Sequence, residues 1–592
     1  MVFEQESRRR IDAGEVVGVR ERPGIHAWRG IPFAQPPVGP LRWKAPRAPL
    51  PWQGTFEAGS HGAMPPQYAD LLAGIKETQS RGQIVGDEDC LTLNVFAPAM
   101  AGDEARERRL PVMVWIYGGG MAVGSSAPYD CARNYAIHDN AVVVTFNYRL
   151  GVLGWFRHPA LFDESSSGED RSGNFGTLDV IAALRWVQRN IAVFGGDPDC
   201  VTIFGESAGG LQVLNMLASP LAAGLFHRAI AQSPAMLDAT PEAATHWTDD
   251  PEPGDANSSW EVTARLLIAA GQAKDRAGAK KRIEEMGGEG LRAFLLERTA
   301  RQLLEVCTPG SAGIYLGPRP IRDGQVLPKA KVVDMLRTGC WNRVPLIVGA
   351  NRDEYKTFMA TAPEHARMFC GVPVLRKRSA YLKEAHYMSR AWRIQGVDEV
   401  ADAVLAGGHA DVWTYRFDWD EYPRIPVIRP DLMLGANHGL EIAFAMRDSV
   451  GEFDLFRSAT KGNRAGRERV AEAMGDFWAR FSAIGEPGRA GDSGPVWSRR
   501  DAGCEAQSMV FDSPSDGGMR MESTHDSFDR LKSDLFRDSG IRSGRFRCQI
   551  YGRLFMWSPI FKGRGGREEY RRWCTEFGCT ESAERFRPAR EI

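Results

Sequence analysis

The stretch from Val201 to Leu217 constrains the fold more than any other part of this 592-residue sequence. A β-branched and aromatic run, Val201–Phe204, leads straight into Gly-Glu-Ser-Ala-Gly at 205–209, and an apolar run suited to a buried helix follows. This pattern predicts a strand, a tight turn and a helix. A Gly-x-Ser-x-Gly turn in that setting is typical of a nucleophile elbow. We expect Ser207 to stand clear of a sheet at a helix N-terminus, with the Ala208 N–H free to face a developing oxyanion.

The pentapeptide alone is weak support for this interpretation. The chain contains 63 glycines, so chance supplies a Gly-x-Ser-x-Gly roughly once in every two or three such chains. The alternative is an ordinary Gly/Ser turn between two packed elements. The flanking strand and helix patterns therefore carry the prediction.

Other apolar segments share the strand pattern and alternate with helical ones. A helix with apolar residues three and four apart is expected at 178–194, where Gly195-Gly-Asp-Pro ends it. Strands alternating with helices predict a mostly parallel sheet covered on both faces, an α/β fold. The expected strands are 86–96, 110–117, 141–147, 201–204, 226–233, 344–350 and 410–417.

Three consecutive glycines, Gly118 to Gly120, directly follow the strand expected at 110–117. One interpretation is a flexible turn. The other is that backbone free of side chains presents its N–H groups to an oxyanion, as the glycine loop after an early strand does in α/β-hydrolases. Gly119 and Gly120 are therefore candidate donors beside Ala208.

A serine nucleophile needs a base, and the base needs an acid that orients it. In this fold both follow the serine in the chain and lie at the ends of later strands. Asp353 and Glu354 directly follow the strand expected at 344–350, and either could be the acid. His438, between glycines after the strand at 410–417, fits the base. The other histidines after Glu354 are His365, His386, His409 and His525.

The remaining chain suggests how the molecule is organised. Prolines in the run 28–43 predict an ordered loop outside the sheet. Arg42 and Glu88 either pair beneath the loops or are both solvated. Residues 236–320 lack a strand pattern and predict a helical insertion, the usual place for a lid or pocket wall. The last core helix is expected at 467–484.

Composition excludes several classes of function. The 75 acidic residues nearly cancel the 74 basic ones, which favours neither nucleic acid nor an anionic membrane. No apolar run approaches the length of a membrane span. The N-terminus lacks the apolar core of a signal peptide, so we expect a cytoplasmic protein, although a secreted protein whose leader had been trimmed would look the same.

The ten cysteines are scattered and form no C-x-x-C pair. This spacing argues against both a zinc site and a disulfide scaffold. Most are expected to be reduced and structural, and a redox role for Cys574 and Cys579 is the less favoured alternative.

Several motifs occur in one order along the chain. They are Arg29–Gly39, Glu88–Val95, Trp115–Gly120, Asn147–Gly151, Phe194–Pro198 and Phe204–Gly210. With them the sequence resembles the type-B carboxylesterase and cholinesterase family of α/β-hydrolases from about residue 14 to about 520. The resemblance implies Ser207 as nucleophile, Glu354 as triad acid and His438 as base, with Gly119, Gly120 and Ala208 as the oxyanion hole.

The sequence departs from the family pattern at several places. Cys90 lacks its usual upstream partner, so the family's N-terminal disulfide is not expected here. Residues 70–89 contain no tryptophan, and the missing choline-binding tryptophan argues against a cholinesterase activity. Asp-Glu-Tyr at 353–355 replaces Asp-Glu-Gly, and Gln-Ser-Pro at 232–234 replaces Gln-Ser-Gly.

These observations lead to a catalytic α/β-hydrolase domain at 1–525 and a C-terminal extension at 526–592. Aromatic residues at helical spacing between Tyr570 and Phe577 suggest that the extension docks onto the core or a neighbouring subunit. The expected function is hydrolysis of a small carboxylic ester through an acyl-enzyme, without metal or organic cofactor. The alternatives are amide, carbamate or thioester hydrolysis by the same triad, or a scaffold relative without activity.

Overall fold

A computed structural model gives the arrangement of most of the chain. It describes residues 3–22, 24–69, 74, 82–307, 318–369, 372–423, 429–448, 451–489, 491, 494–501, 507–561 and 563–588. Two of the ten cysteines, Cys370 and Cys504, lie outside these residues.

An 11-stranded sheet forms the centre of the molecule, in the order β18-β17-β16-β13-β12-β11-β9-β10-β8-β4-β3. Neighbouring strands from β17 to β10 run parallel, and the strands at both edges are antiparallel. The strands are β3 Val19–Arg22, β4 Ile25–Pro32, β8 Thr92–Pro98, β9 Leu110–Ile116, β10 Val142–Phe146, β11 Gly196–Glu206, β12 Arg228–Gln232, β13 Leu346–Asn351, β16 Val412–Phe417, β17 Gln507–Phe511 and β18 Arg520–Ser523.

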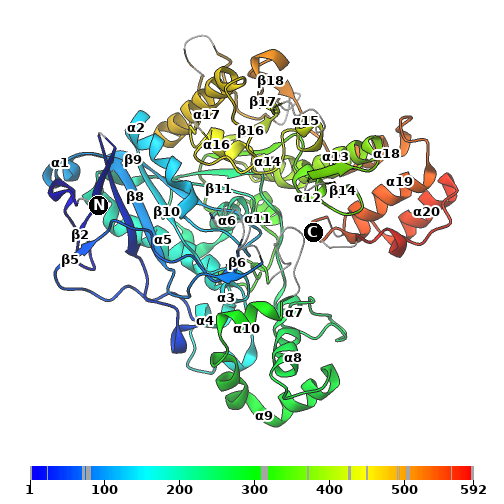
Figure 1. Ribbon diagram of the computed structural model, residues 1–592, viewed down its shortest axis with the longest axis horizontal. Helices are drawn as coiled ribbons and strands as arrows, with labels where there is room; N and C mark the ends of the chain where they lie inside the picture. Colours follow the sequence, from blue (N-terminus) through cyan, green and yellow to red (C-terminus); the bar gives the residue numbers. More distant parts are fainter. Residues whose placement is uncertain are drawn as a thin grey trace.

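The central strands are apolar on both faces, so helices must cover both sides of the sheet. Helices α5, α6, α11 and α14 contact one another in one layer, while α17 packs with α16 over β9 and β11 from the other face (Figure 1). The α/β-hydrolase fold with a mostly parallel sheet is thereby confirmed. These helices are α5 Phe175–Asn190, α6 Ala208–Ala218, α11 Val332–Thr338, α14 Glu399–Ala406, α16 Glu441–Ala445 and α17 Arg464–Ile484.

Shorter elements lie around this core. They are β1 Arg9–Arg10, β2 Glu15–Val17, β5 Thr55–Glu57, β6 Gln67–Tyr68, β7 Ile84–Val85, β14 Ala366–Phe369 and β15 Val372–Leu375, with α1 Gly102–Glu107, α2 Asn134–His138, α3 Gly151–Gly154, α4 Gly168–Ser172, α12 Lys356–Met359 and α15 Pro430–Met433. Among the helices of the described segments, none combines the length and the apolar character that crossing a lipid bilayer requires.

The prediction that the run 28–43 lies wholly outside the sheet is wrong at its start. Strand β4 includes Trp28 and pairs with β8 on one side and β3 on the other. The prolines begin only at Pro32, the last residue of β4, so nothing before it blocks the ladder. The irregularity that the sequence does impose is a register shift between Trp28 and Ile31, where Gly30 adopts a φ of 72°.

The described residues of the segment predicted as a helical insertion form four helices, which lie below the sheet in Figure 1. Helix α10 contacts α3, and α9 contacts the short 3-10 helix Pro159–Leu161. Of the two alternatives for Arg42 and Glu88, pairing is confirmed: Arg42 Nε and Nη2 donate to the Glu88 carboxylate at 2.7 and 2.5 Å. The four helices are α7 Pro241–Thr245, α8 Ser259–Ala269, α9 Arg276–Leu296 and α10 Ala300–Glu305.

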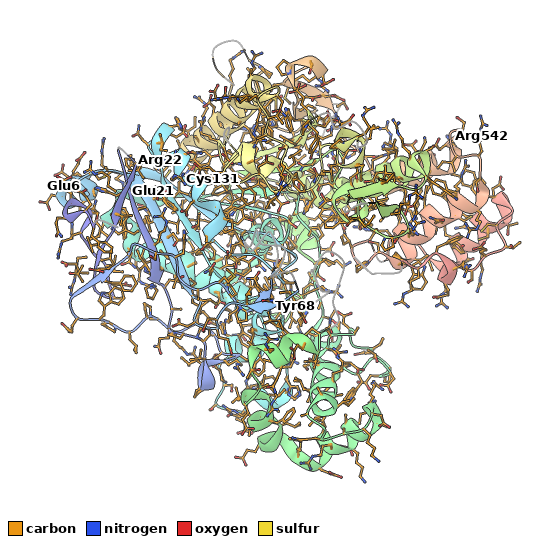
Figure 2. The ribbon with its side chains drawn as sticks, viewed as in Figure 1. Glu6, Glu21, Arg22, Tyr68, Cys131 and Arg542 are labelled. Atoms are coloured by element: carbon orange, nitrogen blue, oxygen red, sulfur yellow. The ribbon has the colours of Figure 1, made fainter. Side chains whose placement is uncertain are left out.

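The C-terminal residues pack on helix α13, Arg378–Arg393, in a hydrophobic cluster separate from the main core. Tyr381 and Met388 of α13 meet Leu531 and Phe555 there. Arg542, in this part of the chain, lies at the opposite end of the molecule from Glu6 (Figure 2). The helices of the extension are α18 Phe528–Arg537, α19 Gly544–Gly552 and α20 Arg567–Phe577.

Candidate active site

Ser207 occupies a strained turn between β11 and α6. Its φ of 58° and ψ of −118° are unusual for a residue with a side chain, and the turn is kept tight by the glycines around it. A Cβ at Gly209 would lie 2.0 Å from the carbonyl oxygen of Ile116, and one at Gly205 would lie 2.6 Å from the same atom. Strand β9 therefore approaches so closely that only glycine fits on either side of the elbow.

The glycine loop after β9 lies against this elbow. A Cβ at Gly118 would be 2.9 Å from the Ser207 Cβ. Gly119 and Gly120 have φ values of 105° and 63°, which favour glycine. Within the described residues, the backbone N–H groups of Gly119, Gly120 and Ala208 have no hydrogen-bond acceptor. Three N–H donors that need a partner thus lie in the glycine loop and at the N-terminus of α6.

His438 and Glu354 meet although 84 positions separate them in the chain. The Glu354 carboxylate accepts a hydrogen bond from His438 Nδ1 at 2.5 Å, and both side chains are buried. The other Glu354 oxygen accepts from the Asn351 N–H at 2.7 Å. This contact places the proton of a neutral imidazole on Nδ1 and leaves Nε2 as its basic atom.

Hydrogen bonds fasten the loop that carries His438 to the loop after β13. Asn351 Nδ2 donates to the Asn437 carbonyl at 2.8 Å, and Asn437 Nδ2 donates to Thr357 Oγ1 at 2.7 Å. The Thr357 hydroxyl in turn donates to the carbonyl of His438 at 3.2 Å. The position of the imidazole is therefore set by two loops that hold each other.

Asp353, the other acid that the sequence allowed, faces elsewhere. Its carboxylate pairs with Lys356 Nζ at 2.9 Å and accepts from the Ala436 N–H at 3.2 Å. Among the alternative histidines, His525 lies 3.1 Å from Asp402 and His365 lies 3.3 Å from Arg553, so both make other contacts. His386 is exposed and His409 bonds the Val344 carbonyl.

Glu206, which the sequence analysis did not single out, lies beside the imidazole. Its Oε1 is 3.2 Å from His438 Nε2, yet that buried oxygen has no aligned hydrogen-bond partner in the described part of the chain. The Ser207 hydroxyl likewise makes no hydrogen bond among the described residues, so the structure joins His438 to the elbow through the neighbour of Ser207. The sequence did contain one indication of this contact, which is that Glu206 directly precedes Ser207.

Buried carboxylates control the charge at this site. Burial by itself would lower the pKa of His438, but Glu206, Glu354 and Glu441 outweigh it and raise the pKa to about 9. Burial raises the pKa of Glu206 well above its usual range, and burial together with Glu354 raises the pKa of Glu441 to about 7. The charges of Glu206, Glu441 and His438 therefore depend on one another.

Two aromatic rings enclose the imidazole. The ring of Trp392, from α13, lies 4.8 Å from that of His438, and the ring of Phe358 lies 5.4 Å away. Trp392 Nε1 donates to the Ser233 carbonyl at 3.3 Å, which fixes the indole. No local pattern identified these residues, because a tryptophan in an amphipathic helix is usually core.

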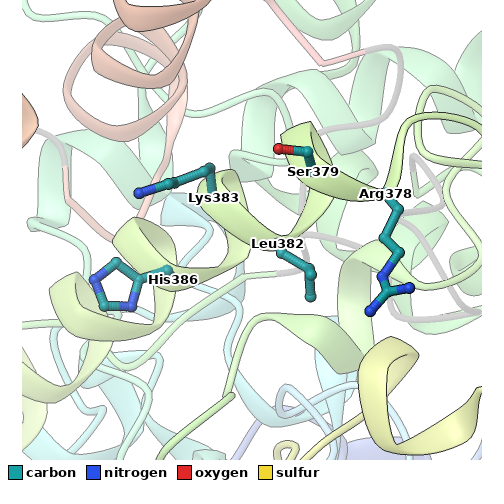
Figure 3. Close-up of a pocket in the computed structure, with 5 residues that line it drawn as sticks. All are labelled: Arg378, Ser379, Leu382, Lys383 and His386. Carbon is teal, nitrogen blue, oxygen red and sulfur yellow. The ribbon is translucent and has the colours of Figure 1, made fainter. Parts of the chain in front are cut away.

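A separate hollow of about 620 Å³ lies along the N-terminal half of α13 and is lined by Arg378, Ser379, Leu382, Lys383 and His386 (Figure 3). Lys383 is paired there with Asp538 at 2.7 Å. At 1.5 Å per residue, His386 is roughly 9 Å along the helix from Trp392. The hollow contains none of the residues predicted for the site.

Comparisons with known proteins agree with this fold. A family model described as the carboxylesterase family matches residues 5–403. The chain is 33% identical over 502 residues to the para-nitrobenzyl esterase of Bacillus subtilis, covering 82% of this chain and 91% of that protein. It is also 33% identical to the fumonisin B1 esterase of Sphingopyxis macrogoltabida, over 81% of this chain and 82% of that one. The solved structure of the Geobacillus stearothermophilus carboxylesterase EST55 matches at 30% identity and a TM-score of 0.64, over 89% of this chain and 99% of the other.

Proposed function

As a member of the carboxylesterase family the chain is a carboxylic ester hydrolase, and we propose that Ser207, His438 and Glu354 carry out its reaction. The observation that supports this assignment most is the buried contact between His438 Nδ1 and Glu354, with Nε2 directed at the residue next to Ser207. A base held by an acid beside a strained serine is the arrangement that acyl transfer requires.

In the proposed reaction, Ser207 Oγ attacks the ester carbonyl carbon while His438 Nε2 accepts the hydroxyl proton. The carbonyl oxygen becomes an oxyanion, which accepts hydrogen bonds from the N–H groups of Gly119, Gly120 and Ala208. Cleavage of the ester C–O bond releases the alcohol, which takes its proton from His438. Water then repeats the sequence on the acyl-enzyme and releases the acid, so that both proton and serine are restored.

The proposed reaction needs a hydrogen bond between the Ser207 hydroxyl and His438 Nε2, and this bond must form when substrate binds. Catalytic hydrogen bonds often tighten only in the substrate complex. We propose that a bound ester displaces the Glu206 carboxylate from Nε2 and lets the imidazole reach the hydroxyl. The substrate is a small molecule, and neither metal nor organic cofactor enters this scheme.

The first test replaces the nucleophile. Ser207→Ala should lower kcat for p-nitrophenyl butyrate by on the order of 10⁴-fold or more, because the triad acts as a unit. Ser482→Ala is the matched control: Ser482 is buried in α17, its hydroxyl has no hydrogen-bond partner in the described structure, and its loss should leave kcat unchanged. Parent-level turnover by Ser207→Ala would refute the assignment.

The scissile bond is a separate question, since the same triad could cleave amides, carbamates or thioesters. Matched ester and amide substrates with the same acyl group would show which bond is preferred, and we propose the ester. A fluorophosphonate probe should label Ser207, and complete absence of labelling would favour a scaffold relative without activity.

A further inference from the structure

Three cysteines converge in the C-terminal helices, although Cys548 is 26 positions from Cys574 in the sequence. Cys548 lies on α19, Cys574 on α20, and Cys579 just beyond α20. Their three sulfur atoms all lie within 4.8 Å of one another, and Cys548 and Cys579 are buried while Cys574 is half-buried. None is in a disulfide.

The local fold holds these side chains together. Gly578 ends α20 with a φ of 62°, and the N–H of Cys579 then bonds back to the carbonyl of Cys574 at 2.9 Å. This turn returns Cys579 to the last turn of the helix. Helices α19 and α20 lie side by side at one end of the molecule (Figure 1), where the rings of Tyr551 and Trp573 pack 4.8 Å apart at an interplanar angle of 40°. The cluster is thus built on rigid elements.

The separations suit a single thiophilic ion. With metal–sulfur bonds of about 2.3 Å, sulfurs around one ion are about 3.8 to 4.0 Å apart. Small side-chain rotations would bring three sulfurs now within 4.8 Å to that spacing. Cysteine sulfur is a soft ligand and selects zinc or Cu⁺ over the hard ions that carboxylates bind.

We propose that Cys548, Cys574 and Cys579 form a three-thiolate site for a soft d¹⁰ cation, Zn²⁺ or Cu⁺. On binding, three S–H bonds break, three metal–sulfur bonds form and three protons pass to solvent, with no change of oxidation state. Among the described residues the group offers no fourth histidine, cysteine or carboxylate. A Cu⁺ ion would be trigonal, whereas Zn²⁺ would take water on the half-buried side of Cys574.

The surroundings are compatible with this charge change. Arg545 pairs with Glu581 at 2.6 Å and lies close to Cys579, so its positive charge is near the three sulfurs. The sequence-based argument against zinc rested on the missing C-x-x-C spacing. That argument does not cover ligands that two different helices bring together.

The experiment uses the full chain, reduced, stripped with a chelator and given Zn²⁺ or Cu⁺ in separate arms, with bound metal measured by mass spectrometry after gel filtration. We expect one ion per chain from at least one arm, and protection of these three thiols from alkylation in that arm. Cys574→Ser should weaken binding by on the order of 100-fold. Cys340→Ser, which removes an exposed thiol elsewhere, should bind as the parent does.

Hydrolysis of p-nitrophenyl butyrate by each variant reports that it has folded, and a Cd²⁺ titration followed by thiolate-to-metal absorption gives a second measurement on the parent chain. Equal metal uptake by the parent and Cys574→Ser would overturn the site. Uptake of neither ion by the reduced parent would also overturn the site. This holds even if two of the three cysteines are found to form a disulfide in air.

Discussion

At the scale of single residues, the environment of His438 is dominated by acids. Glu354 contacts Nδ1, Glu206 lies near Nε2, and Glu441 is close enough to raise the pKa further. A general base works in its deprotonated form, so a raised pKa moves activity toward higher pH. The same carboxylates stabilise the imidazolium that forms during the proposed attack.

Glu206→Gln removes one of these charges while keeping the shape of the side chain. The pKa of His438 should fall, so the acid limb of the kcat/KM profile should move to lower pH, and each unit of that shift is worth about tenfold in neutral imidazole. The profile with p-nitrophenyl butyrate measures it. Glu164→Gln, at an exposed position, is the control.

An unmoved acid limb in Glu206→Gln would contradict this electrostatic role. It would mean that Glu206 holds a proton throughout the working range and exerts no net charge on the imidazole.

The sequence predicted residue types and approximate places better than contacts. It gave Ser207 and the glycines at 119 and 120 from local patterns, because each follows directly from a strand ending in a turn. It left Asp353 and Glu354 open until family resemblance chose between them. Trp392 escaped altogether, since its meeting with His438 depends on how α13 packs and not on any neighbour in the chain.

At the scale of elements, apolar runs predicted the sheet strands β9, β10, β11, β12, β13 and β16, because strands buried on both faces have little other choice. Strand β4 was missed at Trp28 because proline density was averaged over a run whose first residues contain none. The helix expected at 467–484 begins at Arg464 in the structure, a difference within normal fraying of helix ends.

The Arg42 side chain joins three elements that are remote in sequence. Besides Glu88, it donates to the carbonyls of Leu296 and Arg298 at the end of α9, at 3.0 and 2.6 Å. Arg42→Met should lower the free energy of unfolding by up to about 3 kcal/mol, since it leaves a largely buried carboxylate unpaired. Denaturant unfolding measures the loss, and limited proteolysis should show faster cleavage near α9.

The control for that change is Arg282→Met on the exposed surface of α9, where the pair with Glu285 is solvated. Its effect should stay within about 0.5 kcal/mol. Equal stability of the two variants would show that the Arg42 contacts do not hold the helical lobe.

At the scale of the whole molecule, two hydrophobic clusters stabilise the fold. The main one surrounds the sheet, and the second joins α13 to the C-terminal helices. Tyr355, next to the proposed acid, belongs to the second cluster and its ring lies 6.1 Å from that of Phe561. The proposed boundary near 525 therefore marks a change in sequence character within a continuous packing.

Truncation after residue 525 should expose the apolar face of α13 and destabilise the protein by several kcal/mol, because each large apolar side chain buried contributes about 1.5–3 kcal/mol. Thermal unfolding and light scattering would show a lower midpoint and aggregation. Turnover should fall as well, since α13 carries Trp392. A truncated chain with the parent's midpoint and turnover would make the extension an independent unit.

The order of the strands bears on when this protein becomes active. Ser207 directly follows β11, Glu354 follows β13, and the loop of His438 comes after β16, so the proposed triad spans four adjacent strands of the sheet. Roughly 230 residues separate serine from histidine, about 10 to 50 seconds of translation at common ribosomal rates. During that interval the growing polypeptide carries Ser207 without its proposed base, so its chemistry can start only after His438 has been synthesised.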